Sequence, residues 1–204
     1  MKAMRYVIMA NGQGKRWGGY LGKPKHLIEV DGETLLRRTT RLVKQIDPTA
    51  EVFISSSSPA NETAGATRHS PEHAEHELDR FCYELIVPHV CFLYGDTFYT
   101  EETLRSIVGT EASPVVFFGN DKSIVAVKSQ DETRFKELLD TLFARIERGE
   151  IADAKGWDLY RLARERVGET SGAPLFVHVS DSTRDFNAPR DYLEFMSDSA
   201  NEER

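Results

Sequence analysis

The chain has 204 residues and a formal net charge of -7, with 40% apolar and 29% charged residues. This composition is typical of a folded globular protein and excludes a disordered chain. No run of about 18 apolar residues predicts a membrane span, and the acidic balance argues against nucleic acid as a partner. The N-terminus lacks the apolar stretch of a signal peptide. Cys82 and Cys91 lie in apolar surroundings, which favours core thiols in a reducing, cytoplasmic setting over a disulfide or a nucleophile.

The first informative stretch is a glycine-rich loop after a short apolar run. Residues 6–9 read as a buried strand. Gly12 and Gly14 allow a sharp turn, whose N–H groups can form a nest for an anion. No acidic residue occurs over residues 1–28 of this acidic chain, and the basic residues around the loop are Lys15, Arg16, Lys23 and Lys25. The pattern predicts a polyphosphate site; the alternative is an ordinary turn with solvated lysines.

Two common glycine-rich motifs do not match this loop. A phosphate-binding loop of the form G-x-x-x-x-G-K-[ST] fails because Gly14 leads to Gly19 and then to Tyr20 instead of lysine. A dinucleotide fingerprint G-x-G-x-x-G fails because Trp17 stands at the third glycine position. The loop therefore belongs to neither of these two motif classes.

Strands and helices alternate along the next part of the chain, which predicts a mostly parallel sheet with helices on its faces. Helical spacing of apolar residues predicts a helix over 34–46, and strands are expected over 51–55 and 65–69. Residues 71–86 are predicted to form a further helix with one apolar face. His69, His73 and His76 could share a side and hold a metal, but they match no known ligand spacing, so a solvated polar face is the simpler interpretation.

A second candidate site follows the apolar strand predicted over 90–94. This strand ends at Gly95-Asp96, and open parallel sheets bind their ligands beyond the carboxyl ends of the strands. Asp96 is therefore a candidate ligand-binding carboxylate. The alternative is that Asp96 only caps the helix predicted over 100–108.

Two strands, over 113–118 and 123–127, and two helices, over 135–148 and 157–166, are predicted next. The helical region 129–170 is expected to be an elaboration of the sheet that lies beside a bound small molecule, the acceptor of the reaction considered below. Trp157, Asp158 and Tyr160 could form an aromatic, partly acidic pocket there; the alternative is that these aromatic residues only pack the helix.

The last part of the chain is predicted to contain a strand over 174–179 and a final helix that begins at Pro189. We expect one α/β domain over 1–197, with a Rossmann-like, mixed but mostly parallel sheet and helices on both faces. Residues 198–204 are polar and are expected to form a flexible tail. Asp185 and Asn187 either bind a ligand or only start the final helix.

Three separated segments resemble the sugar-phosphate nucleotidyltransferase family. Residues 9–16, MANGQGKR, are similar to its opening pattern L-A-A-G-x-G-[ST]-R, and residues 24–27, PKHL, match its P-K-x-L. Residues 185–191, DFNAPRD, are similar to its closing element D-[IV]-[DN]-T-P-E-D. Asn11 and Lys15 depart from the family pattern, which has alanine and serine or threonine at these positions. The small sugar-1-phosphate and choline-phosphate enzymes of this family, and molybdenum cofactor guanylyltransferases, are the members that the chain resembles.

The resemblance implies transfer of a nucleoside monophosphate from an NTP to a phosphorylated small molecule, either a sugar phosphate or an alcohol phosphate, with release of pyrophosphate. It implies Mg²⁺ as cofactor and Arg16 and Lys25 as catalytic residues. The implied metal ligands are Asp96, Asn187 and Asp185. The implied nucleotide-binding residues are Ala10, Asn11, Gly12, Gln13, Gly14, Lys15, Arg16 and Lys25. In the family, the segment after the third strand helps to recognise the base of the nucleotide, which makes Glu77, Asp79 and Arg80 candidates for this role. The oligomeric state stays open, with a homodimer as one candidate.

Two other functions fit parts of the pattern. A glycosyltransferase that uses a nucleotide-sugar has a related fold, but it would carry D-x-D at the metal strand, whereas Gly95-Asp96-Thr97 offers one carboxylate. A non-catalytic nucleotide-binding module is the other alternative, because Asn11 and Lys15 depart from the family pattern.

Overall fold

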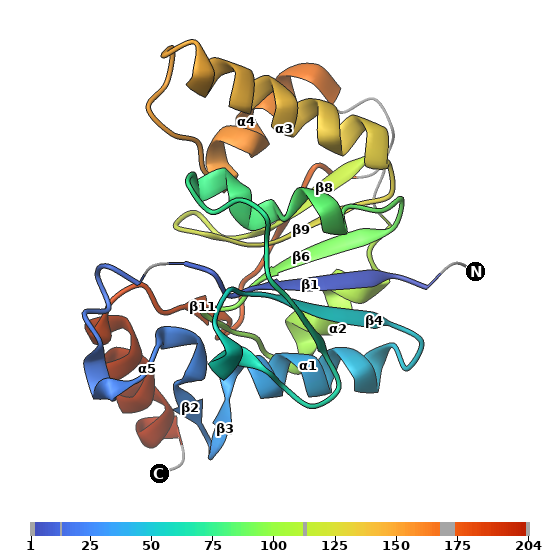
Figure 1. Cartoon of the computed structure of the whole chain (residues 1–204). Coiled ribbons are helices and arrows are strands. Elements are labelled where there is room, and N and C mark those ends of the chain that lie inside the picture. Colours follow the sequence, from blue (N-terminus) through green and yellow to red (C-terminus); the bar gives the residue numbers. More distant parts are fainter. Residues whose placement is uncertain (1–2, 13, 112–113, 168–173, 203–204) are drawn as a thin grey trace.

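The computed structural model describes residues 3–12, 14–111, 114–167 and 174–202, and it is built around one seven-stranded sheet (Figure 1). The strand order is β10-β8-β9-β6-β1-β4-β5. Among the described strands, β9 alone runs antiparallel to both of its neighbours. The strands are β1 Arg5–Met9, β4 Glu51–Ser55, β5 Thr67–His69, β6 Val90–Tyr94, β8 Val115–Gly119, β9 Ile124–Ser129 and β10 Phe176–His178. The predicted mixed, mostly parallel α/β fold is confirmed.

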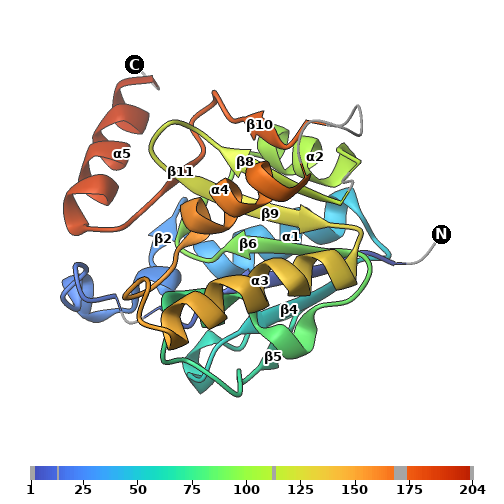
Figure 2. The same cartoon turned by 90° about the horizontal axis from the view of Figure 1, so that it is seen from above.

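Helices cover both faces of this sheet (Figures 1 and 2). α1 (Leu35–Ile46) and α2 (Glu101–Gly109) pack on one face, where they share a core with alternate side chains of β1, β4 and β6. α3 (Glu132–Glu147) and α4 (Gly156–Val167) pack on the other. The region expected to be an acceptor-side elaboration thus also forms the second covering layer of the sheet.

A third, smaller core lies beside the sheet. It supports the glycine-rich segment with its basic residues, residues 10–25, which we call the basic loop. It joins the loop to two short antiparallel strand pairs, the hairpin β2–β3 and the long-range pair β7–β11, and to the last helix, α5 (Pro189–Glu202), which stands apart from the sheet in Figures 1 and 2. The strands of these pairs are β2 Glu29–Val30, β3 Glu33–Thr34, β7 Thr97–Phe98 and β11 Arg184–Asp185. The core residues are Trp17, Ile28, Val30, Leu35, Phe98, Phe186 and Phe195. The indole N–H of Trp17 donates to the carbonyl of Lys23 at 2.9 Å, and this hydrogen bond connects the middle of the loop to its C-terminal part.

The helix predicted over 71–86 is wrong. The segment instead contains two short 3-10 helices, η4 Glu77–Phe81 and η5 Tyr83–Leu85, with a break at Cys82. The apolar residues that suggested a helix are still buried: Leu78, Phe81, Cys82, Leu85 and Ile86. Asp79 accepts from the backbone N–H of His76 at 2.7 Å and starts η4 there. The remaining 3-10 turns are η1 Tyr20–Gly22, η2 Lys25–Leu27 and η3 Pro59–Asn61.

The last helix extends into the polar tail. Residues 198–202, predicted as part of a flexible tail, continue α5 to Glu202, and the flexibility of this segment stays a prediction. Residues 203–204 lie outside the described residues, as does Ser113 at the start of the strand predicted over 113–118. None of the described helices is both long and apolar enough to cross a membrane.

The small core makes a stability prediction. Phe186→Ala removes a fully buried ring that contacts Tyr192 and Phe195, and it should lower the free energy of unfolding by about 3–5 kcal/mol because the cavity can close only in part. Leu193→Ala, in α5 with 51% of its surface exposed, is the control and should change stability by less than about 0.5 kcal/mol. Urea unfolding of both variants measures the difference, and equal effects would contradict this role of the core.

Candidate functional site

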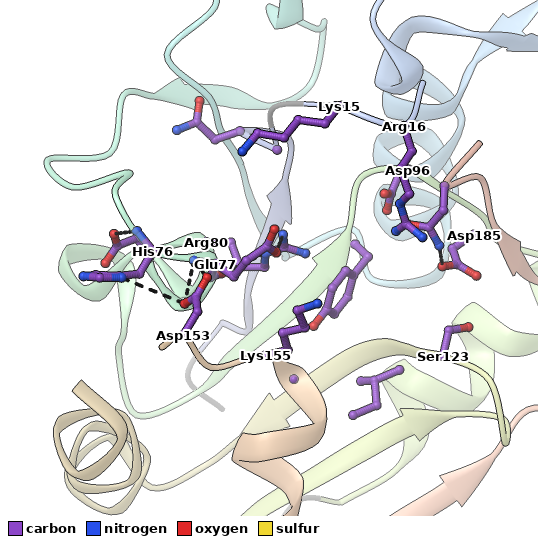
Figure 3. A pocket seen from close by; sticks show the side chains of 18 of the residues that line it. Lys15, Arg16, His76, Glu77, Arg80, Asp96, Ser123, Asp153, Lys155 and Asp185 are labelled. Atoms are coloured by element: carbon purple, nitrogen blue, oxygen red, sulfur yellow. Dashed lines mark hydrogen bonds and ion pairs between the residues drawn. The ribbon is translucent and has the colours of Figure 1, made fainter. Parts of the chain in front are cut away.

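A cleft of about 570 Å³ opens at the carboxyl ends of β1 and β6 (Figure 3). Its walls come from the basic loop, from the segment around η4, from the β8–β9 turn and from the residues around β11 and the start of α4. The cleft brings together most of the residues that the sequence singled out. Those that line it are Asn11, Gly12, Gly14, Lys15, Arg16, Lys25, His73, His76, Glu77, Asp79, Arg80, Asp96, Trp157, Asp185 and Asn187, whereas His69 does not line it.

The basic loop is anchored to the strand ends behind it. The N–H of Ala10 donates to the carbonyl of Ser55 at 2.9 Å, and the buried Asn61 donates to the carbonyl of Ala10 at 3.1 Å. The Asn11 side chain accepts from the N–H of Ser57 at 2.9 Å, so this departure from the family pattern joins the loop to the end of β4. Ala10 itself is buried and does not line the cleft.

Two glycines of the site meet a backbone requirement. Gly14 has a φ of 59°, a left-handed conformation that side chains disfavour, and it turns the loop toward the cleft. Gly95 packs so closely on β1 that an added Cβ would lie 2.7 Å from the carbonyl oxygen of Met9. This close approach fixes Asp96 at the bottom of the cleft. Gln13, a predicted nucleotide-binding residue, lies outside the described residues.

Lys25 and Asp96 form an ion pair at the bottom of the cleft. The Lys25 ammonium contacts Oδ2 of Asp96, and the two side chains are only 12% and 10% exposed. Burial raises the pKa of Asp96, but the charges of Lys25 and Arg80 and the hydrogen bond from Lys25 lower it by more, so the pKa lies below its ordinary value. Asp96 is therefore ionised and already holds a cation.

The alternative role of Asp96 as a helix cap is wrong. Thr100 caps α2, because its hydroxyl accepts from the N–H of Thr103 at 3.0 Å. Asp96 instead lies beside the C-terminal motif: β11 pairs antiparallel with β7, and the N–H of Phe186 donates to the carbonyl of Asp96 at 2.8 Å. The backbone thus brings residues 96 and 185–187 together.

Asp185 and Asn187 also do more than start α5. The Asn187 amide donates to Asp185, and its oxygen accepts from Arg16 at 2.9 Å, which connects the motif to the basic loop. Asp191 accepts from the N–H groups of Asn187 and Ala188 and so supports the start of the helix. In Figure 3, Arg16, Asp96 and Asp185 gather at one end of the cleft. The carboxylate oxygens of Asp96 and Asp185 and the amide oxygen of Asn187 have the chemistry that Mg²⁺ prefers.

Of the three predicted acceptor residues, Trp157 alone lines the cleft. Its ring stacks on Phe176, with centroids 5.9 Å apart, and meets the ring of Tyr160 edge-on at 5.8 Å. Tyr160 packs against Phe117 and Phe176 in the core, as the packing alternative expected. Asp158 accepts from the N–H of Lys155 at 2.8 Å and from Arg161 at 2.6 Å, so it caps the first turn of α4.

Other cleft residues were not predicted from the sequence. Lys122 and Ser123 come from the β8–β9 turn, and Lys155 precedes α4; Figure 3 shows Lys155 and Ser123 on the wall opposite the basic loop. Neither Lys122 nor Lys155 forms an ion pair with the described residues. Asp153 accepts from the N–H of Glu77 at 3.2 Å and closes the remaining side. In the sequence, the one feature that could have pointed to these cleft residues was the position of Lys122 in a turn next to a strand end.

Comparison with known proteins agrees with this geometry. The family model of the MobA-like NTP transferase domain matches residues 6–167, which confirms the resemblance found in the sequence. No curated protein matches the chain. Solved structures with the same fold include Rv0371c from Mycobacterium tuberculosis H37Rv, at 18% identity and a TM-score of 0.64, over 96% of this chain and 98% of that one.

Two further structures carry names of enzymes. One is 4-diphosphocytidyl-2C-methyl-D-erythritol synthase from Anaerococcus prevotii, at 16% identity and a TM-score of 0.66, over 100% of this chain and 97% of that one. The other is CTP:phosphocholine cytidylyltransferase from Streptococcus pneumoniae, at 10% identity and a TM-score of 0.60, over 95% and 97%. At these identities the likeness shows the fold alone.

His26, next to Lys25, gives a pH prediction. Burial lowers its pKa from 6.5 to about 4, so the unfolded chain binds a proton more readily than the folded protein between these values. Stability should therefore fall as pH drops from 6.5 to 4, by about 3 kcal/mol from this residue. Urea unfolding across this range should show a smaller loss for His26→Gln. The exposed His178→Gln is the control, and a wild-type loss in His26→Gln would contradict the prediction.

Proposed function

Because the chain belongs to the MobA-like NTP transferase family, we propose that it transfers the nucleoside monophosphate of an NTP to the phosphate of a small acceptor and releases pyrophosphate. The observation that carries this proposal is the contact between Lys25 and Asp96 at the bottom of the cleft. The contact supports a site in which a cationic side chain and a carboxylate are positioned beside each other before a polyphosphate binds.

The residues present suit this chemistry. A phosphate monoester has a second pKa near about 6, so the acceptor oxygen is already an anionic nucleophile at neutral pH and needs no general base. The protein must position two highly charged groups and neutralise them. Lys15 and Arg16 would hold the phosphates of the NTP together with the N–H groups of the loop. Lys25 would lie against the α-phosphate and stabilise the charge that develops during attack.

The carboxylate end of the cleft fits Mg²⁺. Asp96, Asp185 and Asn187 offer oxygen ligands from two segments that the backbone joins, and Asp96 already holds the ammonium of Lys25 in the place of another cation. When bound there, Mg²⁺ would neutralise phosphate charge and orient the two substrates. Asp96 and Asp185 would hold the ion, with Asn187 positioned by Arg16.

The acceptor is assigned to the opposite wall. Lys122 and Lys155 are cations without ion-pair partners among the described residues, and Ser123 adds a hydroxyl, so this wall suits the phosphate of the acceptor. Trp157 offers an aromatic face for the rest of the molecule. Sugar phosphates and alcohol phosphates are the acceptor classes that we propose; molybdopterin is a third class to be tested beside them.

Thermal unfolding with each of the four common NTPs tests the proposal. A ligand that binds only the folded state raises the melting temperature by mass action. One NTP should raise it most, and Mg²⁺ should increase that shift. Pyrophosphate release is then measured with this NTP and each acceptor class. A response to a nucleotide-sugar but to no NTP would contradict the proposal in favour of a glycosyltransferase, and NTP binding without release with any acceptor would favour a binding module.

Substitution of Lys25 tests its catalytic role. Lys25→Ala should lower kcat/KM by about 30-fold or more, equivalent to about 2 kcal/mol of transition-state stabilisation, and Asp96→Ala should have an effect at least as large. Lys23→Ala is the matched control, because Lys23 lies in the same segment but is 50% exposed and pairs with Glu29. Lys25→Ala also leaves the buried Asp96 unpaired, so rates are compared where melting curves show both variants folded. Wild-type turnover in Lys25→Ala would remove this residue from the mechanism.

A further inference from the structure

A second cluster of potential ligands lies outside the cleft. It consists of His69 at the end of β5, Cys82 between η4 and η5, and Glu84 in η5. One donor atom from each side chain lies within 4.8 Å of the other two, and Nε2 of His69 is 3.0 Å from Oε1 of Glu84. None of the three residues lines the cleft.

The surroundings of this cluster hold the donor atoms in place. Cys82 is 1% exposed, whereas the side chains of His69 and Glu84 are 29% and 24% exposed, so a buried sulfur lies beneath two ligands that solvent can reach. The N–H of Glu72 donates to Oε1 of Glu84 at 2.9 Å and orients the carboxylate. The fully buried hydroxyl of Ser55 forms no hydrogen bond with the described residues.

We propose that His69, Cys82 and Glu84 bind one Zn²⁺ ion. Zinc binds sulfur at about 2.3 Å and nitrogen or oxygen at about 2.0–2.2 Å, so two ligands of a tetrahedral ion lie about 3.5 Å apart. The imidazole and the carboxylate are already close to this separation, and no pair of donor atoms must approach by more than about 1.3 Å. Three protein ligands leave the fourth position to water, which makes this an exchangeable site.

The ligand set selects zinc over the magnesium of the cleft. A thiol and an imidazole favour borderline-soft ions, whereas Mg²⁺ takes oxygen ligands. Burial raises the pKa of the Cys82 thiol to about 12 in the absence of a metal, so zinc must displace the thiol proton when it binds. Bound zinc would join β5 to the segment that carries Glu77 and Arg80 into the cleft.

Metal titration of the reduced full-length chain tests the proposal. In the presence of excess Mg²⁺ to occupy the cleft, Zn²⁺ should bind at one ion per chain and raise the melting temperature. Co²⁺ in place of Zn²⁺ should give the near-ultraviolet charge-transfer band of a cobalt–thiolate bond. Cys82→Ser should abolish this band. His69→Gln, at a partly buried position, should weaken Zn²⁺ binding at least tenfold.

Matched controls separate this site from adventitious binding. Cys91→Ser removes the other buried cysteine and His73→Gln a neighbouring exposed histidine; both should keep wild-type metal binding. If Cys82→Ser does not fold, the His69→Gln titration decides. No Zn²⁺ binding, Co²⁺ binding without the thiolate band, or unchanged affinity in His69→Gln would overturn the proposal and leave a hydrogen-bonded triad without a metal.

Discussion

The site depends on an ion pair that is almost removed from water. Lys25 and Asp96 are both nearly buried, and a buried charge is tolerated only when a partner compensates it. Each therefore requires the other. The surrounding structure serves to keep them in register: Gly95 lets β6 approach β1, and the small core beside the sheet holds the segment that carries Lys25.

Around this pair the fold joins segments that are far apart in the sequence. Arg16 reaches Asn187 across 171 positions, and the N–H of Phe186 reaches the carbonyl of Asp96. Both contacts rest on the short pairing of β7 with β11 rather than on the large sheet. The sheet thus sets the floor of the cleft, while small secondary elements set the relative positions of its charged groups.

The parts of the site that could be predicted from the sequence are those in which a short motif also fixes the backbone. The glycine loop and Gly95-Asp96 are of this kind, because each directly follows a strand, and residues 185–187 were identified by their resemblance to the family's closing element. The prediction of a helix over 71–86 was wrong because apolar residues three or four positions apart are buried in an α-helix and also in two 3-10 helices with a break between them. Lys122 and Lys155 were missed since only the packing of α4 on the sheet brings them together, and no local pattern records that.

The core beside the sheet also sets an order of assembly during synthesis. Trp17, in the basic loop, leaves the ribosome well before Phe186 and Phe195, which pack in the same core. Chains fold from the N-terminal end as they emerge. The central strands can pair early, whereas the end of the cleft that holds Arg16 and Asn187 has to wait for α5, so a chain that is cut short before this helix would carry the sheet without a finished cleft.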